Sequence, residues 1–215
     1  MEYKNKYTLI IWDWNGTLFD DLKWCMSTIN SLLQKRGIKT LDTISDYHNV
    51  FCFPIIQYYR NAGFDFNKEP FEKLAAEFIA IYHSDNTGNS QLYSGAEIVL
   101  NEIRNRGINQ IILSASEIDN LLSQINMFDI SHYFSDILGL SDIYAKSKID
   151  IGKKYIENNK QERAVLIGDT AHDYEVACTL GVDCLLIANG HQSKETLLKC
   201  GVPVLDNILQ VLDYV

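Results

Sequence analysis

The chain has 215 residues, of which 47% are hydrophobic and 22% charged, with only 3 prolines. A chain of this length can bury about 70% of its unfolded surface. The composition is that of an ordinary folded protein and excludes disordered or collagen-like structure. It carries 19 Lys and Arg against 28 Asp and Glu, a net charge of -9 without any basic stripe, which argues against nucleic acid as a partner. No apolar run approaches the roughly 20 residues of a membrane helix, and the first residues turn acidic too soon for a signal peptide, so we expect a cytoplasmic protein that binds no membrane.

The first predicted element is a strand over residues 7–12, a continuous apolar run typical of a strand covered on both faces of a sheet. The charged residue Asp13 follows this strand directly. A helix is predicted next, because apolar residues from Leu22 to Leu33 recur every three or four positions and Gly37 is placed to end it.

From Asp42 to Asp85 no strand-like run occurs, and the pattern instead predicts helices that begin near Pro54 and Pro70, since proline is well tolerated at a first helical position. The polar stretch after them is typical of a linker. We therefore expect an inserted helical domain over residues 21–87, with residues 1–20 and 88–215 forming the core.

Strands and helices alternate in the rest of the chain. A capping box at Ser94–Glu97 predicts the start of the first of these helices. The expected strands are at residues 109–114, 136–140, 164–168, 183–188 and 203–205. Between them we expect one helix that begins at Ser116, a second at about residues 149–158, a third that passes through Leu180, and a fourth at residues 194–199. This alternation predicts an α/β fold with a doubly wound parallel sheet, whose ligands bind beyond the carboxyl ends of the strands.

Polar groups follow three of the expected strands at those ends: Asp13, Ser114 and the pair Gly168–Asp169. The sequence Asp-Trp-Asn-Gly-Thr-Leu from Asp13, together with Ser114, a lysine, and Gly-Asp-x-x-x-Asp ending at Asp173, resembles the four motifs of the haloacid dehalogenase superfamily. The resemblance is greatest to phosphoglycolate-phosphatase-like members with a small helical cap. It covers nearly the whole chain and implies a Rossmann-type core.

The resemblance implies phosphoryl transfer through a covalent intermediate. Asp13 would attack phosphorus and become an aspartyl phosphate, which divides one difficult displacement into two easier ones. Asp13 and Asp169 supply the oxygen ligands that Mg²⁺ prefers. By resemblance, the backbone carbonyl of Asn15 completes the protein ligands, and Asp173 binds the metal directly or through water.

Further site residues are expected around the phosphoryl group. Ser114 and nearby backbone N–H groups can donate to its oxygens, and a lysine neutralises the remaining charge. Lys148, directly before an apolar helix, is the preferred lysine, with Lys146 as the second candidate. The residues expected to contact substrate are Gly16, Thr17, Ser114, Ala115 and, from the cap, Arg60.

The chain departs from the family at Asn15, where phosphatases usually carry a second aspartate that protonates the leaving alcohol. An amide cannot exchange a proton at neutral pH, so a contribution of about 10²–10⁴-fold to the rate is in doubt. Three outcomes are open: slow turnover or esters with good leaving groups, a relay through another residue such as His172, or a protein that only binds a phosphorylated ligand.

Other functions compete with that of a phosphatase acting on a small phosphorylated metabolite. A 2-haloacid dehalogenase needs neither Mg²⁺ nor a second acid, but Asp169 and Asp173 beside an attacking carboxylate make little sense without a metal. A receiver-like signalling domain would be shorter and would carry its aspartate after a later strand. A noncatalytic phospholigand binder fits every motif and explains Asn15. The substrate and the oligomeric state do not follow from the sequence.

Overall fold

The computed structural model describes residues 6–84, 91–141, 148–159 and 163–215 of the chain. Its main sheet has the strand order β5-β4-β1-β6-β7-β8, with every neighbouring pair parallel. The six strands are β1 (Leu9–Trp12), β4 (Asn109–Glu117), β5 (Asp136–Leu140), β6 (Ala164–Gly168), β7 (Asp183–Ile187) and β8 (Val204–Leu205). The expected doubly wound α/β fold is confirmed.

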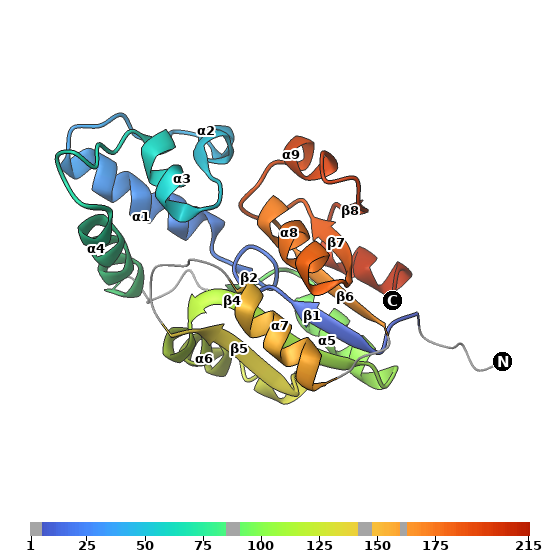
Figure 1. Ribbon diagram of the computed structural model, residues 1–215. Helices are drawn as coiled ribbons and strands as arrows, with labels where there is room; N and C mark the ends of the chain where they lie inside the picture. Colours follow the sequence, from blue (N-terminus) through green and yellow to red (C-terminus); the bar gives the residue numbers. More distant parts are fainter. Residues whose placement is uncertain (1–5, 85–90, 142–147, 160–162) are drawn as a thin grey trace.

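Helices cover both faces of the sheet (Figure 1) because alternate residues of each strand point to opposite faces. On β1, Ile10 and Trp12 pack into one apolar cluster, and Leu9 and Ile11 pack into the other. The first cluster is covered by α5 (Ala96–Asn105), α6 (Ile118–Met127) and η2 (Ile208–Asp213); the second is covered by α7 (Ile149–Asn158), α8 (Ala171–Leu180) and α9 (Lys194–Leu198). A short η1 (Ser131–Tyr133) precedes β5.

A group of helices stands apart from the sheet in Figure 1, and we call it the cap. The cap comprises α1 (Leu22–Lys35), α2 (Ile44–Val50), α3 (Ile55–Ala62) and α4 (Phe71–Ser84). These helices share an apolar cluster of their own, which includes Ile29, Leu33, Tyr59 and Leu74. Helices α3 and α4 begin directly after Pro54 and Pro70, as predicted. The predicted boundary at residues 87 and 88 lies outside the described residues.

Three features differ from the sequence prediction or were absent from it. The chain connects the sheet to the cap through a small antiparallel pair, β2 (Phe19–Asp20) with β3 (Gln91–Leu92), whose strands are too short for a periodic pattern. Helix α2 was also missed, although the sequence carries a capping box at its start, Thr43 with Asp46. The capping box predicted at Ser94–Glu97 is wrong, because Gly95 with a φ of 90° starts α5 without any side-chain cap.

None of the helices in the described part of the chain combines the length and the apolar character that crossing a bilayer requires.

Candidate active site

Strand register brings the predicted motif residues to one edge of the sheet. Trp12 of β1 pairs with Ile112 of β4 on one side and with Ile167 of β6 on the other. Asp13 follows Trp12 directly, and Ser114 and Asp169 each follow their paired residue by two positions. Because parallel strands end at the same edge, side chains from three distant segments meet above β1.

Three buried carboxylates converge at this edge. Oxygen atoms of Asp13, Asp169 and Asp173 all lie within 4.8 Å of one another, and the three residues are 8%, 0% and 2% exposed. The Lys148 ammonium lies 2.5 Å from Asp13 Oδ1 and 2.7 Å from Asp173 Oδ1. The structure therefore brings Lys148 to the site, as predicted, whereas the alternative Lys146 lies outside the described residues.

The cluster carries more negative charge than its own lysine neutralises. Burial raises the pKa of Asp13 to about 6 in spite of the attraction of Lys148, and burial with the neighbouring carboxylates raises the pKa of Asp169 to about 8 in spite of His191. The pKa of Asp173 is lowered, because the Lys148 ammonium and hydrogen bonds outweigh the effect of burial. Three carboxylates against one ammonium leave a deficit that a divalent cation would cancel.

The geometry of the donors also fits such a cation. Oxygens on opposite sides of a Mg²⁺ ion lie about 4.2 Å apart, since each is about 2.1 Å from the metal. The bound of 4.8 Å on the spacing of the three carboxylates is close to this separation, and hard carboxylate oxygens are the donors that Mg²⁺ prefers.

Asp169 is held tightly in place. Its Oδ1 accepts a hydrogen bond from the Thr17 hydroxyl at 3.1 Å, and its Oδ2 accepts one from the His191 backbone N–H at 2.6 Å. A Cβ atom added at Gly16 would come within 2.3 Å of Asp169 Oδ2, and one added at Gly190 within 2.1 Å. Gly16 also has a φ of 75°, which favours glycine. Gly16 and Thr17, predicted as substrate contacts, lie against this carboxylate and are not among the residues that line the cavity described below.

Asp173 uses its two carboxylate oxygens for different contacts. Its Oδ2 accepts hydrogen bonds from the backbone N–H and the hydroxyl of Thr170, which completes the capping box of α8. Its Oδ1 faces Lys148. The helix cap therefore fixes the carboxylate that faces the lysine.

Asn15 is engaged in hydrogen bonds with protein on both sides of its amide. Its Nδ2 donates to Asp21 Oδ2 at 2.8 Å and lies 3.3 Å from the Tyr82 hydroxyl, and its Oδ1 accepts from the Ser116 hydroxyl at 2.7 Å. The carboxylate of Asp21 can only accept, so the amide nitrogen must be the group that faces it. The site is thus built around a neutral amide at position 15.

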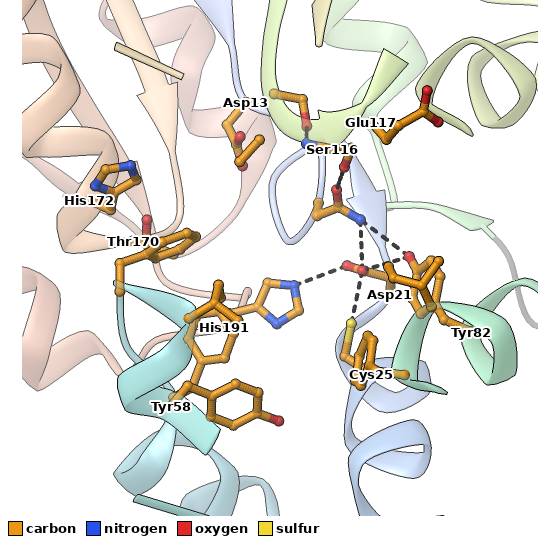
Figure 2. Close-up of a pocket in the computed structure, with 18 of the residues that line it drawn as sticks. Asp13, Asp21, Cys25, Tyr58, Tyr82, Ser116, Glu117, Thr170, His172 and His191 are labelled. Carbon is orange, nitrogen blue, oxygen red and sulfur yellow. Dashed lines mark hydrogen bonds and ion pairs between the residues drawn. The ribbon is translucent and has the colours of Figure 1, made fainter. Parts of the chain in front are cut away.

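Asp21 and His191 form a buried ion pair that sequence reasoning missed (Figure 2). The Asp21 carboxylate accepts a hydrogen bond of 3.1 Å from His191 Nε2, while the Tyr47 hydroxyl lies 2.9 Å from Nδ1. Burial lowers the pKa of His191, but the Asp21 carboxylate outweighs this effect and raises the pKa to about 9. Conversely, burial raises the pKa of Asp21, and His191 with hydrogen-bond donors lowers it by more.

These two residues do not replace the missing acid. Asp21 is ionised at neutral pH and has no proton to give, and both ring nitrogens of His191 are used in hydrogen bonds. The sequence contained no motif around Asp21 or His191, because their roles depend on contacts across 170 residues of chain.

A cavity of about 200 Å³ lies between the carboxylates and the cap. Asp13, Ser114, Ala115 and Lys148 line it on the core side. The Ser114 oxygen accepts a hydrogen bond from the Ser116 N–H at 3.0 Å, which leaves its own O–H available to donate. These predicted residues are brought together at the floor of the cavity.

Two other predicted residues lie differently. Arg60 is exposed on α3, its guanidinium lies over the Phe66 ring at 5.4 Å, and it is not part of the cavity wall, so the structure does not bring it to the site. His172 does line the cavity, and its ring stacks on Phe53 of the cap at 4.5 Å. Its Nε2 is buried without a hydrogen-bond partner among the described residues.

The fold is an α/β core that carries a helical cap and a cluster of carboxylates at the strand ends, and comparison with known proteins gives its family. The model of the haloacid dehalogenase-like hydrolases matches residues 10–187, and the chain belongs to this family.

Individual relatives are distant. The chain is 24% identical over 199 residues to the Mycobacterium tuberculosis protein named tyrosine-protein kinase PtkA. The matched region covers 91% of this chain and 67% of that protein. The solved structure of PtkA covers 98% of both chains with a TM-score of 0.82 at 22% identity. A haloacid dehalogenase-like hydrolase of Streptococcus pneumoniae also has a TM-score of 0.82, at 20% identity over 97% of this chain and 98% of its own. A predicted phosphoglycolate phosphatase of Haemophilus somnus has a TM-score of 0.78 at 18% identity, over 98% and 99%. At these identities the structures share the fold.

Proposed function

We propose that the protein is a Mg²⁺-dependent hydrolase of a small phosphomonoester, which acts through an aspartyl phosphate formed on Asp13. The observation that carries the proposal is the position of the Asp13 carboxylate. It lies at the end of the central strand, on the floor of the cavity, in an ion pair with Lys148 and beside two further carboxylates.

Each group at the floor has a role in this reaction. Asp13, Asp169 and Asp173 would hold Mg²⁺, with the backbone carbonyl of Asn15 as a further ligand, and the bound ion supplies Lewis-acid stabilisation of charge on the phosphoryl oxygens. Lys148 offsets the charge of the attacking Asp13 carboxylate, and the Ser114 hydroxyl is free to donate to a phosphoryl oxygen.

The substrate we propose is a small phosphorylated metabolite and not a nucleic acid or a membrane surface. The net charge of -9 would repel a polynucleotide, and the cavity of about 200 Å³ suits a small molecule.

The proposal is tested by measuring phosphate release from a panel of phosphomonoesters with Mg²⁺ and with a chelator. We expect release with Mg²⁺ only. Asp13→Asn removes the nucleophile and should abolish it. Asp20→Asn is the matched control, because Asp20 accepts a hydrogen bond from Gln91 in the small sheet and does not line the cavity. Equal rates in the two variants would contradict the role of Asp13.

A noncatalytic phospholigand binder is the second candidate, favoured by the fully engaged amide of Asn15. It predicts phosphate binding by calorimetry with no phosphate release from any ester. A 2-haloacid dehalogenase predicts halide release without metal, and the charge of three clustered carboxylates favours it less.

A further inference from the structure

The wall of the cavity opposite the carboxylates is aromatic. The cap contributes rings and aliphatic side chains from three helices and the loop between two of them, among them Phe51, Phe53, Tyr58, Phe71, Phe78 and Ile79. Apolar cavities of about 150 Å³ take up benzene, so a cavity of about 200 Å³ has room for a single aromatic ring. A polyol placed against the phenylalanine rings of this wall would lose hydrogen bonds to water without gaining partners from them.

Among its described lining residues, the cavity also has no second lysine or arginine for another anionic group of the substrate. Among the described residues that line it, Lys148 is the only lysine or arginine, and its ammonium already contacts Asp13 and Asp173. The His191 ring is paired with Asp21. A substrate carboxylate, such as that of phosphoglycolate, would find no free lysine or arginine among these residues.

The amide at position 15 also restricts which leaving groups can depart. Asn15 has no proton to give to a departing oxygen, and its amide is already bonded to Asp21 and Ser116. A phenol has a pKa of about 10, as in tyrosine, and departs as its anion. An aliphatic alcohol is a much weaker acid and depends on a general acid, which position 15 does not supply.

Resting on the proposed function, we propose that the substrate is a small aryl phosphate, the phosphate monoester of a phenol. An oxygen of the Asp13 carboxylate bonds to phosphorus as the bond from phosphorus to the aryl oxygen breaks. The electron pair leaves with that oxygen as a phenolate, which takes its proton from water. Water then attacks the aspartyl phosphate, which releases inorganic phosphate, a proton and the Asp13 carboxylate.

The experiment compares kcat/KM of the full chain, with Mg²⁺, for four substrates: phenyl phosphate, phosphoglycolate, glycerol phosphate and acetyl phosphate. Acetyl phosphate needs no leaving-group proton and has no ring, so it reports formation and hydrolysis of the aspartyl phosphate alone. We expect phenyl phosphate to exceed phosphoglycolate and glycerol phosphate by about 100-fold or more, the lower end of what a general acid contributes.

Variants of the cap test the binding of the ring. Phe53→Ala removes an aromatic wall residue and should lower kcat/KM for phenyl phosphate by about 10-fold while acetyl phosphate is unaffected. Phe66→Ala is the matched control, because Phe66 is a half-buried cap phenylalanine that packs against Phe71 and does not line the cavity. It should change neither substrate.

The two proposals fail in distinguishable ways. If acetyl phosphate is turned over but phosphoglycolate or glycerol phosphate matches phenyl phosphate, the aryl proposal is wrong and the hydrolase proposal stands. If no substrate releases phosphate, acetyl phosphate included, both proposals are wrong. Equal losses for phenyl phosphate and acetyl phosphate in both Phe53→Ala and Phe66→Ala would show a general effect on the cap, which would also overturn the aromatic wall as the source of specificity.

Discussion

Replacing Asn15 with aspartate is the most informative single change in this protein. The amide nitrogen lies 2.8 Å from Asp21 Oδ2, so the variant places a second carboxyl group at that distance from an ionised carboxylate. Two unit charges at this separation repel by about 6 kcal/mol at an effective dielectric constant of about 20. The new carboxyl group therefore has a raised pKa and keeps its proton at neutral pH.

A carboxyl group of this kind is suited to act as a general acid. We expect Asn15→Asp to raise kcat for glycerol phosphate by about 10²–10⁴-fold, because an alkoxide leaving group needs the proton. Phenyl phosphate, whose leaving group departs unprotonated, should change by less than about 10-fold. The assay is initial-rate phosphate release from the two esters at pH 7 with Mg²⁺.

The same variant has a signature in stability. Its new carboxyl group has a folded pKa above the unfolded value of about 3.9, so the folded state holds a proton that the unfolded state has released. Relative to the natural protein, stability is unchanged below about pH 4 and is lost as pH rises through the folded pKa. The loss reaches about 1.4 kcal/mol for each pH unit that separates the folded pKa from the unfolded one. Urea unfolding at several pH values measures this loss.

Asn61→Asp is the control for both measurements, because Asn61 is exposed and its hydrogen bonds to Gln57, Val50 and Cys52 in the described part of the chain involve no carboxylate. It should alter neither the ratio of the two rates nor the pH dependence. If Asn15→Asp accelerates both esters equally, or destabilises the fold by the same amount at every pH, then the reasoning from Asp21 is refuted.

Three further predictions concern the carboxylate cluster. Gly16→Ala should abolish the rise in melting temperature with Mg²⁺, because its Cβ would meet Asp169 at 2.3 Å, whereas Gly37→Ala, with a similar φ of 65° but nothing within 4 Å, should keep it. Without metal, the free energy of unfolding should fall as pH rises from about 4 through the raised pKa values of Asp13 (about 6) and Asp169 (about 8). Mg²⁺ should stabilise the fold increasingly over that range. Calorimetry that shows a flat pH profile would contradict this. Lys148→Met should lower the free energy of unfolding by about 3–5 kcal/mol in urea at pH 8 with a chelator, because it leaves buried carboxylates unpaired. The loss should be smaller at pH 5, and an equal loss at both pH values would contradict that cause.

Much of the core and the floor of the site follows from short-range patterns. Apolar runs and helical spacing predicted the order of strands and helices, and polar residues directly after those runs predicted Asp13, Ser114 and Asp169 as neighbours, because parallel strands end at one edge. The preference for Lys148 came from its place before an apolar helix, and the structure puts it against Asp13.

The second half of the site was beyond this kind of reasoning. Asp21, Tyr82 and His191 meet only because the cap closes onto the core, and nothing near each of them in sequence indicates the others. Arg60 was predicted as a substrate contact from the cap, but the sequence does not say which face of its helix borders the cavity. Its guanidinium lies over Phe66 instead. The type of a residue does not predict which way its side chain points.

The most direct measurement of the central claim is a crystal structure of the protein with Mg²⁺ and trifluoroberyllate, a mimic of a phosphoryl group on aspartate. We predict beryllium bonded to a carboxylate oxygen of Asp13, with one Mg²⁺ ion bound by Asp13 and Asp169 and the Lys148 ammonium beside the fluorines. A crystal grown at millimolar Mg²⁺ in which Asp13 bears no such group, or in which the ion binds away from these carboxylates, would contradict the account.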